Sequence, residues 1–122
     1  MSSEKEMTDA LDALQKDTDG FIAASLVDLE SGMTLAVKTS RTDFDLTAAS
    51  AYNSELVKQK LKIMTTLGLT GSIEDMLISL TEQIHLIKMV SPTTFLYVAV
   101  DKSQSNLAIV RSAVSRHVKA LL

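Results

Sequence analysis

The alternation of apolar and polar residues along the chain predicts eight secondary-structure elements. Apolar residues recur at helical spacing near both ends and in a long central segment, and strand-like runs lie between these segments. In chain order we expect a helix that begins near Met7 and ends before Gly20, strands over 21–27 and 33–39, a helix over 46–67, strands over 72–80, 84–90 and 94–100, and a closing helix over 107–121. The short connections between strands predict antiparallel neighbours in an α/β (α+β) fold of order α-β-β-α-β-β-β-α.

The pattern within each strand indicates its place in the sheet. The runs 21–27 and 94–100 are apolar on both faces, so they are expected side by side at the centre. Apolar and polar residues are mixed in 33–39, which is typical of an edge strand. Because the central strands need cover on both faces, we expect the long helix on one face and the two terminal helices on the other.

Polar residues before each helix are candidate N-caps. Ser3 or Thr8 is expected to cap the first helix, Asp45 the second, and Ser103 or Ser105 the third. The closing helix is expected to bury one apolar stripe, made of Leu107, Val110, Val114, Val118 and Leu121.

The long helix has an unusually wide apolar surface. At about 100° per residue its apolar positions form two stripes rather than the single stripe needed to cover a sheet. One stripe contains Ala49, Tyr52, Leu56, Ile63 and Leu67, and the other contains Leu46, Val57, Leu61 and Met64. Asn53 and Lys60 lie between them. One stripe can cover the helix's own sheet while the other meets a second body, with Asn53 fixing the register of a helix pair. Alternatively the helix is deeply embedded, Asn53 finds a partner and Lys60 extends to solvent.

Composition narrows the class of protein. A chain of 122 residues with 46% apolar content fits one domain, 1–122, with a real core. The apolar runs are too short to cross a membrane, and 1–15 lacks a secretory apolar region, which predicts a cytoplasmic protein without membrane insertion. Without cysteine there is no disulfide, thiolate nucleophile or thiolate zinc site. A net charge of −3 without a basic stripe argues against nucleic acid as a partner.

No residue pattern indicates catalysis. His85 and His117 are isolated and are interpreted as structural. No glycine-rich phosphate loop is present. Glu74 and Asp75 point to opposite faces of a strand, so we interpret them as solubilising charges that guard an edge and not as metal ligands. We therefore expect no enzyme activity, no catalytic residue, no cofactor and no metal.

Three lysines give the long helix positive charge. Lys58, Lys60 and Lys62 are opposed by only one acid, Glu55, between residues 46 and 67. The lysines could attract an acidic partner surface, or they could simply be solvated.

Several segments together resemble the Roadblock / dynein light chain family in its small bacterial, stand-alone form. They are the helix before Gly20, the strand 20–28, the hairpin 28–32, the Ala/Leu-rich helix from Leu46, and the run 95–101 before the last helix. The resemblance implies a profilin-like fold with a five-stranded antiparallel sheet. It also implies a homodimer formed through the long helix and the following strand, where Met76 and Ile78 join the helix residues above as interface candidates. A profilin-like or longin-type domain that binds a single partner shares parts of this pattern.

The resemblance implies two functions for a non-catalytic dimer. The first is regulation of a small Ras-like GTPase, including GTPase activation, through the paired long helices. Such a regulator can act without an arginine finger, and we assign that role to neither Arg41 nor Arg111. The second is a scaffold or adaptor in a motor or signalling complex, independent of nucleotide. A small-molecule sensor is disfavoured because five aromatic residues offer few pocket walls.

Overall fold

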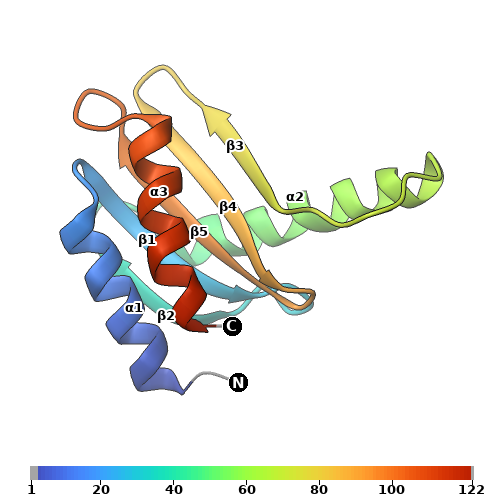
Figure 1. Ribbon diagram of the computed structural model, residues 1–122, viewed down its shortest axis with the longest axis horizontal. Coiled ribbons are helices and arrows are strands. Elements are labelled where there is room, and N and C mark those ends of the chain that lie inside the picture. Colours follow the sequence, from blue (N-terminus) through green and yellow to red (C-terminus); the bar gives the residue numbers. More distant parts are fainter. Residues whose placement is uncertain (1–2, 122) are drawn as a thin grey trace.

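A computed structural model describes residues 3–121, and its elements follow the predicted order (Figure 1). The elements are α1 (Glu4–Asp17), β1 (Phe21–Asp28), β2 (Thr34–Thr39), α2 (Leu46–Thr66), β3 (Asp75–Ser79), β4 (Gln83–Ser91), β5 (Thr94–Asp101), α3 (Leu107–Val118) and a closing 3₁₀ turn η1 (Lys119–Leu121). The predicted third strand began three residues too early, because 72–74 belong to the connection from α2.

The five strands form one antiparallel sheet in the order β2-β1-β5-β4-β3. The two runs predicted at the centre, now β1 and β5, are neighbours and are buried from Ile22 to Val27 and from Phe95 to Val100. The strand predicted at an edge, β2, lies at one edge, and β3 lies at the other.

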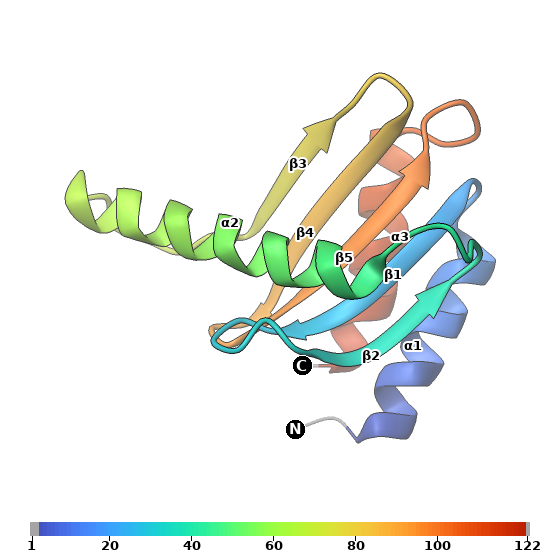
Figure 2. The same cartoon turned by 180° about the vertical axis from the view of Figure 1, so that it is seen from behind.

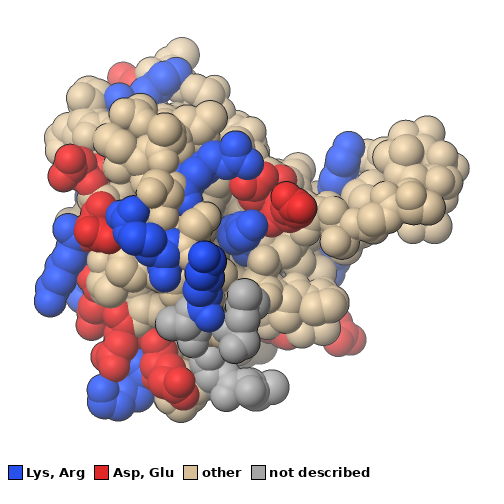
Figure 3. Space-filling view, in the orientation of Figure 1, with Lys and Arg blue, Asp and Glu red and all other residues tan. Residues whose placement is uncertain are grey.

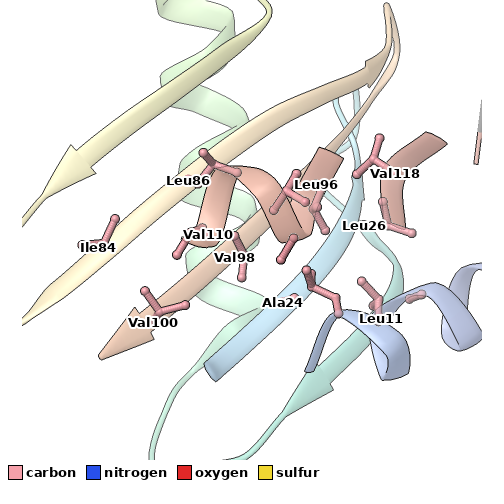
Figure 4. Packing of buried hydrophobic residues seen from close by; sticks show 14 residues of the cluster. Leu11, Ala24, Leu26, Ile84, Leu86, Leu96, Val98, Val100, Val110 and Val118 are labelled. Carbon is pink, nitrogen blue, oxygen red and sulfur yellow. The ribbon is translucent and has the colours of Figure 1, made fainter. Parts of the chain in front are cut away.

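Helices cover both faces of the sheet, as the apolar central strands require (Figures 1 and 2). On one face, α1 and α3 pack on a core that includes Leu11, Leu96, Val98 and Val114 (Figure 4). On the other face, α2 packs on a second core, which includes Leu46, Val57, Ile87, Phe95 and Tyr97. Each of these large side chains stabilises the fold by about 1.5–3 kcal/mol when fully buried.

The N-caps of α1 and α2 are confirmed, whereas that of α3 is corrected. Ser3 Oγ accepts a hydrogen bond from the Glu6 backbone N–H at 3.1 Å, and Asp45 Oδ1 accepts one from Ala48 N–H at 3.0 Å. The cap of α3 is Asn106, whose Oδ1 accepts from Ile109 N–H at 3.0 Å. Ser103 instead donates its hydroxyl to Asp101 Oδ1 at 2.7 Å, so the loop occupies it.

Two further expectations are corrected by packing. Leu107 is 42% exposed because it lies in the first turn of α3, outside the core cluster that buries Val110, Val114 and Val118. Asp75 is not a free solubilising charge: its side chain is only 18% exposed and accepts a hydrogen bond from Arg111 Nη2 at 2.9 Å. This ion pair ties the edge strand β3 to α3. Among residues 3–121, no helix has both the length and the apolarity needed to cross a membrane.

Candidate functional site

The two apolar stripes of α2 have different surroundings. Leu46 and Val57 are 7% and 0% exposed and face the sheet, and Leu61 and Met64, on the same stripe, are half-buried. The other stripe is open: Tyr52 is 76%, Leu56 38%, Ile63 38% and Leu67 66% exposed, and only Ala49 packs partly against the core. We call the four exposed residues Tyr52, Leu56, Ile63 and Leu67 the α2 stripe.

The second half of α2 projects beyond the sheet as an arm (Figures 1 and 2). Val57 is the last residue of the helix whose side chain is buried, and Leu69, just after the tip, is 53% exposed. On the side seen in Figure 3, the arm is mostly uncharged, with blue lysine or arginine surface near its base. A short helix without tertiary packing is marginal in water, because most helical stability in proteins comes from burying one face. We therefore interpret the arm as a candidate interface, whose apolar face would be buried by another protein.

Two buried serines seat the first half of α2 on the sheet. Ser50 Oγ lies 2.7 Å from Ser25 Oγ of β1, and Ser54 donates its hydroxyl to the backbone oxygen of Leu29 at 2.6 Å. Sequence reasoning missed these residues because it followed apolar spacing alone. The signal was present, since Ser50 and Ser54 are four residues apart and adjoin the Leu46–Val57 side of the helix.

Asn53 and Lys60 behave differently at the boundary between the stripes. Asn53 is half-buried and hydrogen bonds with the hydroxyl of Tyr97, while Lys60 is exposed. Burial raises the pKa of Tyr97 to about 12, and the Asn53 side chain partly opposes that rise. Asn53 thus has a partner in its own subunit, as the alternative interpretation required. Its role in setting the register of a helix pair stays a prediction.

His85 forms a small polar cluster on the α2 face of the sheet. Its Nε2 lies 2.7 Å from Gln83 Oε1 and its Nδ1 lies 3.4 Å from Tyr97 Oη, and its ring meets the Tyr97 ring edge-on with centroids 5.5 Å apart. Burial lowers the pKa of His85. His117 contacts Asp17 Oδ2 at 2.9 Å on the opposite layer. Within residues 3–121, no group of three or more His, Cys, Asp or Glu side chains is placed to hold a metal ion.

The lowered pKa of His85 predicts a pH-dependent stability. The unfolded chain takes up this proton near pH 6.5 and the folded chain does so at lower pH, so the stabilisation is complete above about pH 7 and is lost as the pH falls through 6.5. Between pH 7.5 and 5.5 the Tm should fall further in the unsubstituted protein than in His85→Gln, measured by circular dichroism. Equal falls would contradict this assignment. The carboxyls with lowered pKa, such as Asp17 and Asp101, titrate below this window.

The two open edges of the sheet are built differently. At β2 the register with β1 is interrupted between Leu26 and Val27, and Lys38 forms an ion pair with Asp12 at 2.9 Å. Bulges and edge lysines are common protections against strand pairing. β3 pairs with β4 without interruption from Asp75 to Ser79. Met76 and Ile78 lie half-buried on this strand, and the connection 67–74 joins it directly to the tip of the arm.

The predicted interface residues therefore divide into three groups. Exposed on α2 are Tyr52, Leu56, Lys60, Ile63 and Leu67; half-buried at the stripe boundary, along the arm or on β3 are Ala49, Asn53, Leu61, Met64, Met76 and Ile78; buried against the sheet are Leu46 and Val57. The last two cannot contact a partner while α2 stays on its sheet. The exposed set and the regular edge of β3 are joined by one connection, and this combined surface is the candidate site.

Solved structures share this fold over nearly the whole chain. The structure is similar to Myxococcus xanthus MglB, with a TM-score of 0.88 and 16% identity over 99% of this chain and 88% of that chain. It is also similar to an MglB described with a tetrameric arrangement, with a TM-score of 0.84 and 16% identity over 99% of this chain and 89% of that chain. A Roadblock/LC7 domain from Streptomyces avermitilis is similar with a TM-score of 0.78 and 15% identity over 99% of this chain and 95% of that chain.

Sequence comparison adds nothing to this likeness, since no protein-family model and no curated protein matches the chain. At 15–16% identity the structural likeness concerns the fold. The protein has the Roadblock/LC7 fold.

Proposed function

We propose that this protein is a non-catalytic homodimer that regulates a small Ras-like GTPase. The observation that carries the proposal is the exposed α2 stripe, whose last two residues, Ile63 and Leu67, lie on the arm that projects beyond the sheet. Contiguous apolar surface of this kind marks an interaction site, since a monomer in water gains nothing from exposing it.

A second copy of the chain is the simplest partner for the stripe. In a two-fold dimer the same patch meets itself, so a row of apolar side chains along one helix is self-complementary. The regular, open edge of β3 adjoins the arm and supports pairing of the two β3 strands alongside the helices. This is the arrangement that the Roadblock resemblance implies, with one sheet continuing across both subunits.

Regulation of a GTPase is supported by the Roadblock/LC7 fold together with what that family resemblance implies. The proposed regulator supplies a surface and no reacting group, and it acts by positioning the GTPase's own groups. Neither arginine considered above is offered as a finger. Arg111 is held by Asp75 at 2.9 Å, and Arg41 lies 3.8 Å from Asp101.

Nucleotide-dependent binding tests the proposal. Each small Ras-like GTPase encoded in the source genome would be purified, loaded with GDP or with the non-hydrolysable analogue GppNHp, and titrated by calorimetry against the full chain. One GTPase should bind at least about tenfold tighter in one nucleotide state, a difference of about 1.4 kcal/mol, because a regulator must distinguish states. Equal affinity for both states would instead favour a dimeric scaffold or adaptor, and no binding to any of them would contradict a GTPase partner.

A further inference from the structure

His85 and Ile78 lie next to the open edge of the sheet, on the face that carries α2. In the strand register His85 pairs with Ala99 of β5 on one side and with Ile78 of β3 on the other. Paired residues share a face of the sheet, and Ala99 belongs to the core under α2, so all three side chains lie on that face. His85 and Ile78 are only half-buried. Figure 2 shows that α2 crosses the sheet near the start of β3, away from the strand end that carries Ile78.

The α2 stripe borders this uncovered part of the sheet. Asn53, between the two stripes, hydrogen bonds with the hydroxyl of Tyr97, and that hydroxyl contacts His85. The far flank of the helix faces the other way, because Lys58 donates a hydrogen bond to the backbone oxygen of Glu30 in the β1–β2 hairpin at 2.7 Å. The stripe therefore lies on the flank of α2 that faces the ends of β3 and β4.

The proposed dimer, on which this inference rests, brings the partner's arm to these residues. A two-fold axis perpendicular to the sheet pairs the β3 strands antiparallel, so each arm crosses near the start of its own β3 and continues over the end of the other β3. Leu61 is the last α2 residue that packs against its own core. The six residues from there to Leu67 span about 9 Å, which is about two strand spacings. The arm can therefore cover the partner's Ile78 and the partner's His85.

The hydrogen bonds of His85 fit a neutral ring. Its Nε2 lies 2.7 Å from Gln83 Oε1, and an amide oxygen only accepts, so we assign the ring proton to Nε2. Nδ1 is then the acceptor for the Tyr97 hydroxyl at 3.4 Å. A second proton on Nδ1 would compete with the hydroxyl proton of Tyr97 and disrupt this chain, which continues to Asn53 on α2.

The charged and titratable groups on this face give a protonated His85 no counter-ion. On β5 they are Tyr97, a neutral hydroxyl whose pKa burial raises to about 12, and Asp101, which lies 3.8 Å from Arg41. On the same flank of α2 the charged residue is Lys60, a cation, and β3 contributes an apolar side chain. Among the residues that the structure describes, no carboxylate pairs with the His85 ring.

The partner's arm adds positive charge to these surroundings. Residues 58–67 contain three lysines and no carboxylate, and the arm's part of the α2 stripe is apolar. Burial already lowers the pKa of His85 in the single subunit. Covering the ring with an apolar, lysine-bearing helix would lower it further, because lost hydration and like charge both disfavour the imidazolium.

We propose that His85 makes dimerisation pH-dependent, because the partner's arm can cover the neutral ring but not the protonated ring. The dimer is strongest above the pH at which the free subunit takes up this proton, and it weakens as the pH falls through that value. Each dimer contains two such rings, so the effect occurs twice. Acidification therefore separates the paired helices and releases the regulated GTPase.

The dimer Kd of the full chain at pH 7.5 and pH 5.5, measured by sedimentation velocity, tests this inference. In the unsubstituted protein the Kd should rise at least about fivefold at the lower pH, since two linked protonations oppose the contact. His85→Gln, which takes up no proton, should dimerise at pH 7.5 and change by less than about twofold. His117→Gln is the matched control and should keep the pH dependence. His117 is the second of the chain's two histidines and contacts Asp17 on the opposite layer.

An NMR titration of the unsubstituted protein separates proton linkage from any structural effect of a substitution. The His85 imidazole should titrate at lower pH when the protein concentration is above the dimer Kd than when it is below, because only the dimer covers the ring. Equal titration curves, or a Kd that is the same at both pH values, would overturn the inference while the dimer stood. A chain that is monomeric at both pH values would refute the proposed dimer itself, so the two failures are distinguishable.

Discussion

Leu56→Asp is expected to convert the dimer into folded monomers. Leu56 is 38% exposed at the middle of the α2 stripe. A two-fold interface would contain the introduced carboxylate twice, and burying an unpaired charge costs several kcal/mol per site. The dimer Kd should therefore rise at least about a hundredfold, which corresponds to about 2.7 kcal/mol.

Light scattering across a dilution series measures this change directly. The unsubstituted protein should have twice the chain mass of 13.2 kDa, and the variant should have the chain mass with an unchanged far-UV spectrum. Leu107→Asp, which adds the same charge at a similarly exposed leucine on α3, should remain a dimer. If the unsubstituted protein is monomeric at every concentration, the dimer that both functional hypotheses require does not form. A profilin-like domain that binds one partner would then be favoured.

Hydrophobic periodicity was sufficient to predict the double stripe but not its orientation. Spacing fixes the angles between residues on one helix, and Leu46, Val57 and Tyr52 were assigned to the correct stripes from those angles alone. Both stripes are apolar, so nothing in the spacing says which one meets the sheet. The orientation depends on tertiary contacts, and the buried hydroxyls of Ser50 and Ser54 help to fix it.

Contacts between residues that are far apart in the chain could not be predicted from the sequence. Asp75 and Arg111 are 36 residues apart, and neither position carries a local signal that β3 and α3 will meet there. Mixed polarity in 33–39 correctly predicted an edge strand, but only the fold shows that Val37 lies half-exposed on the α2 face of the sheet while Ala36 is buried under α1 and α3.

Val57→Asp is expected to unfold the protein, whereas Leu56→Asp, at the neighbouring position, is expected to leave each subunit folded. Val57 is 0% exposed and packs in the core between α2 and the sheet. An unpaired carboxylate there would cost at least about 4 kcal/mol, a large part of the 5–15 kcal/mol that typically stabilises a domain.

Urea denaturation followed by circular dichroism separates the two neighbours. Val57→Asp should lose the folded baseline or shift the midpoint strongly, and Val57→Ala should lie between it and the unsubstituted protein. The stability of Leu56→Asp should be compared at concentrations where the unsubstituted protein is also monomeric, because dissociation alone lowers the apparent stability of a dimer. A folded, monomeric Val57→Asp together with an unfolded Leu56→Asp would mean that the stripes face the opposite way.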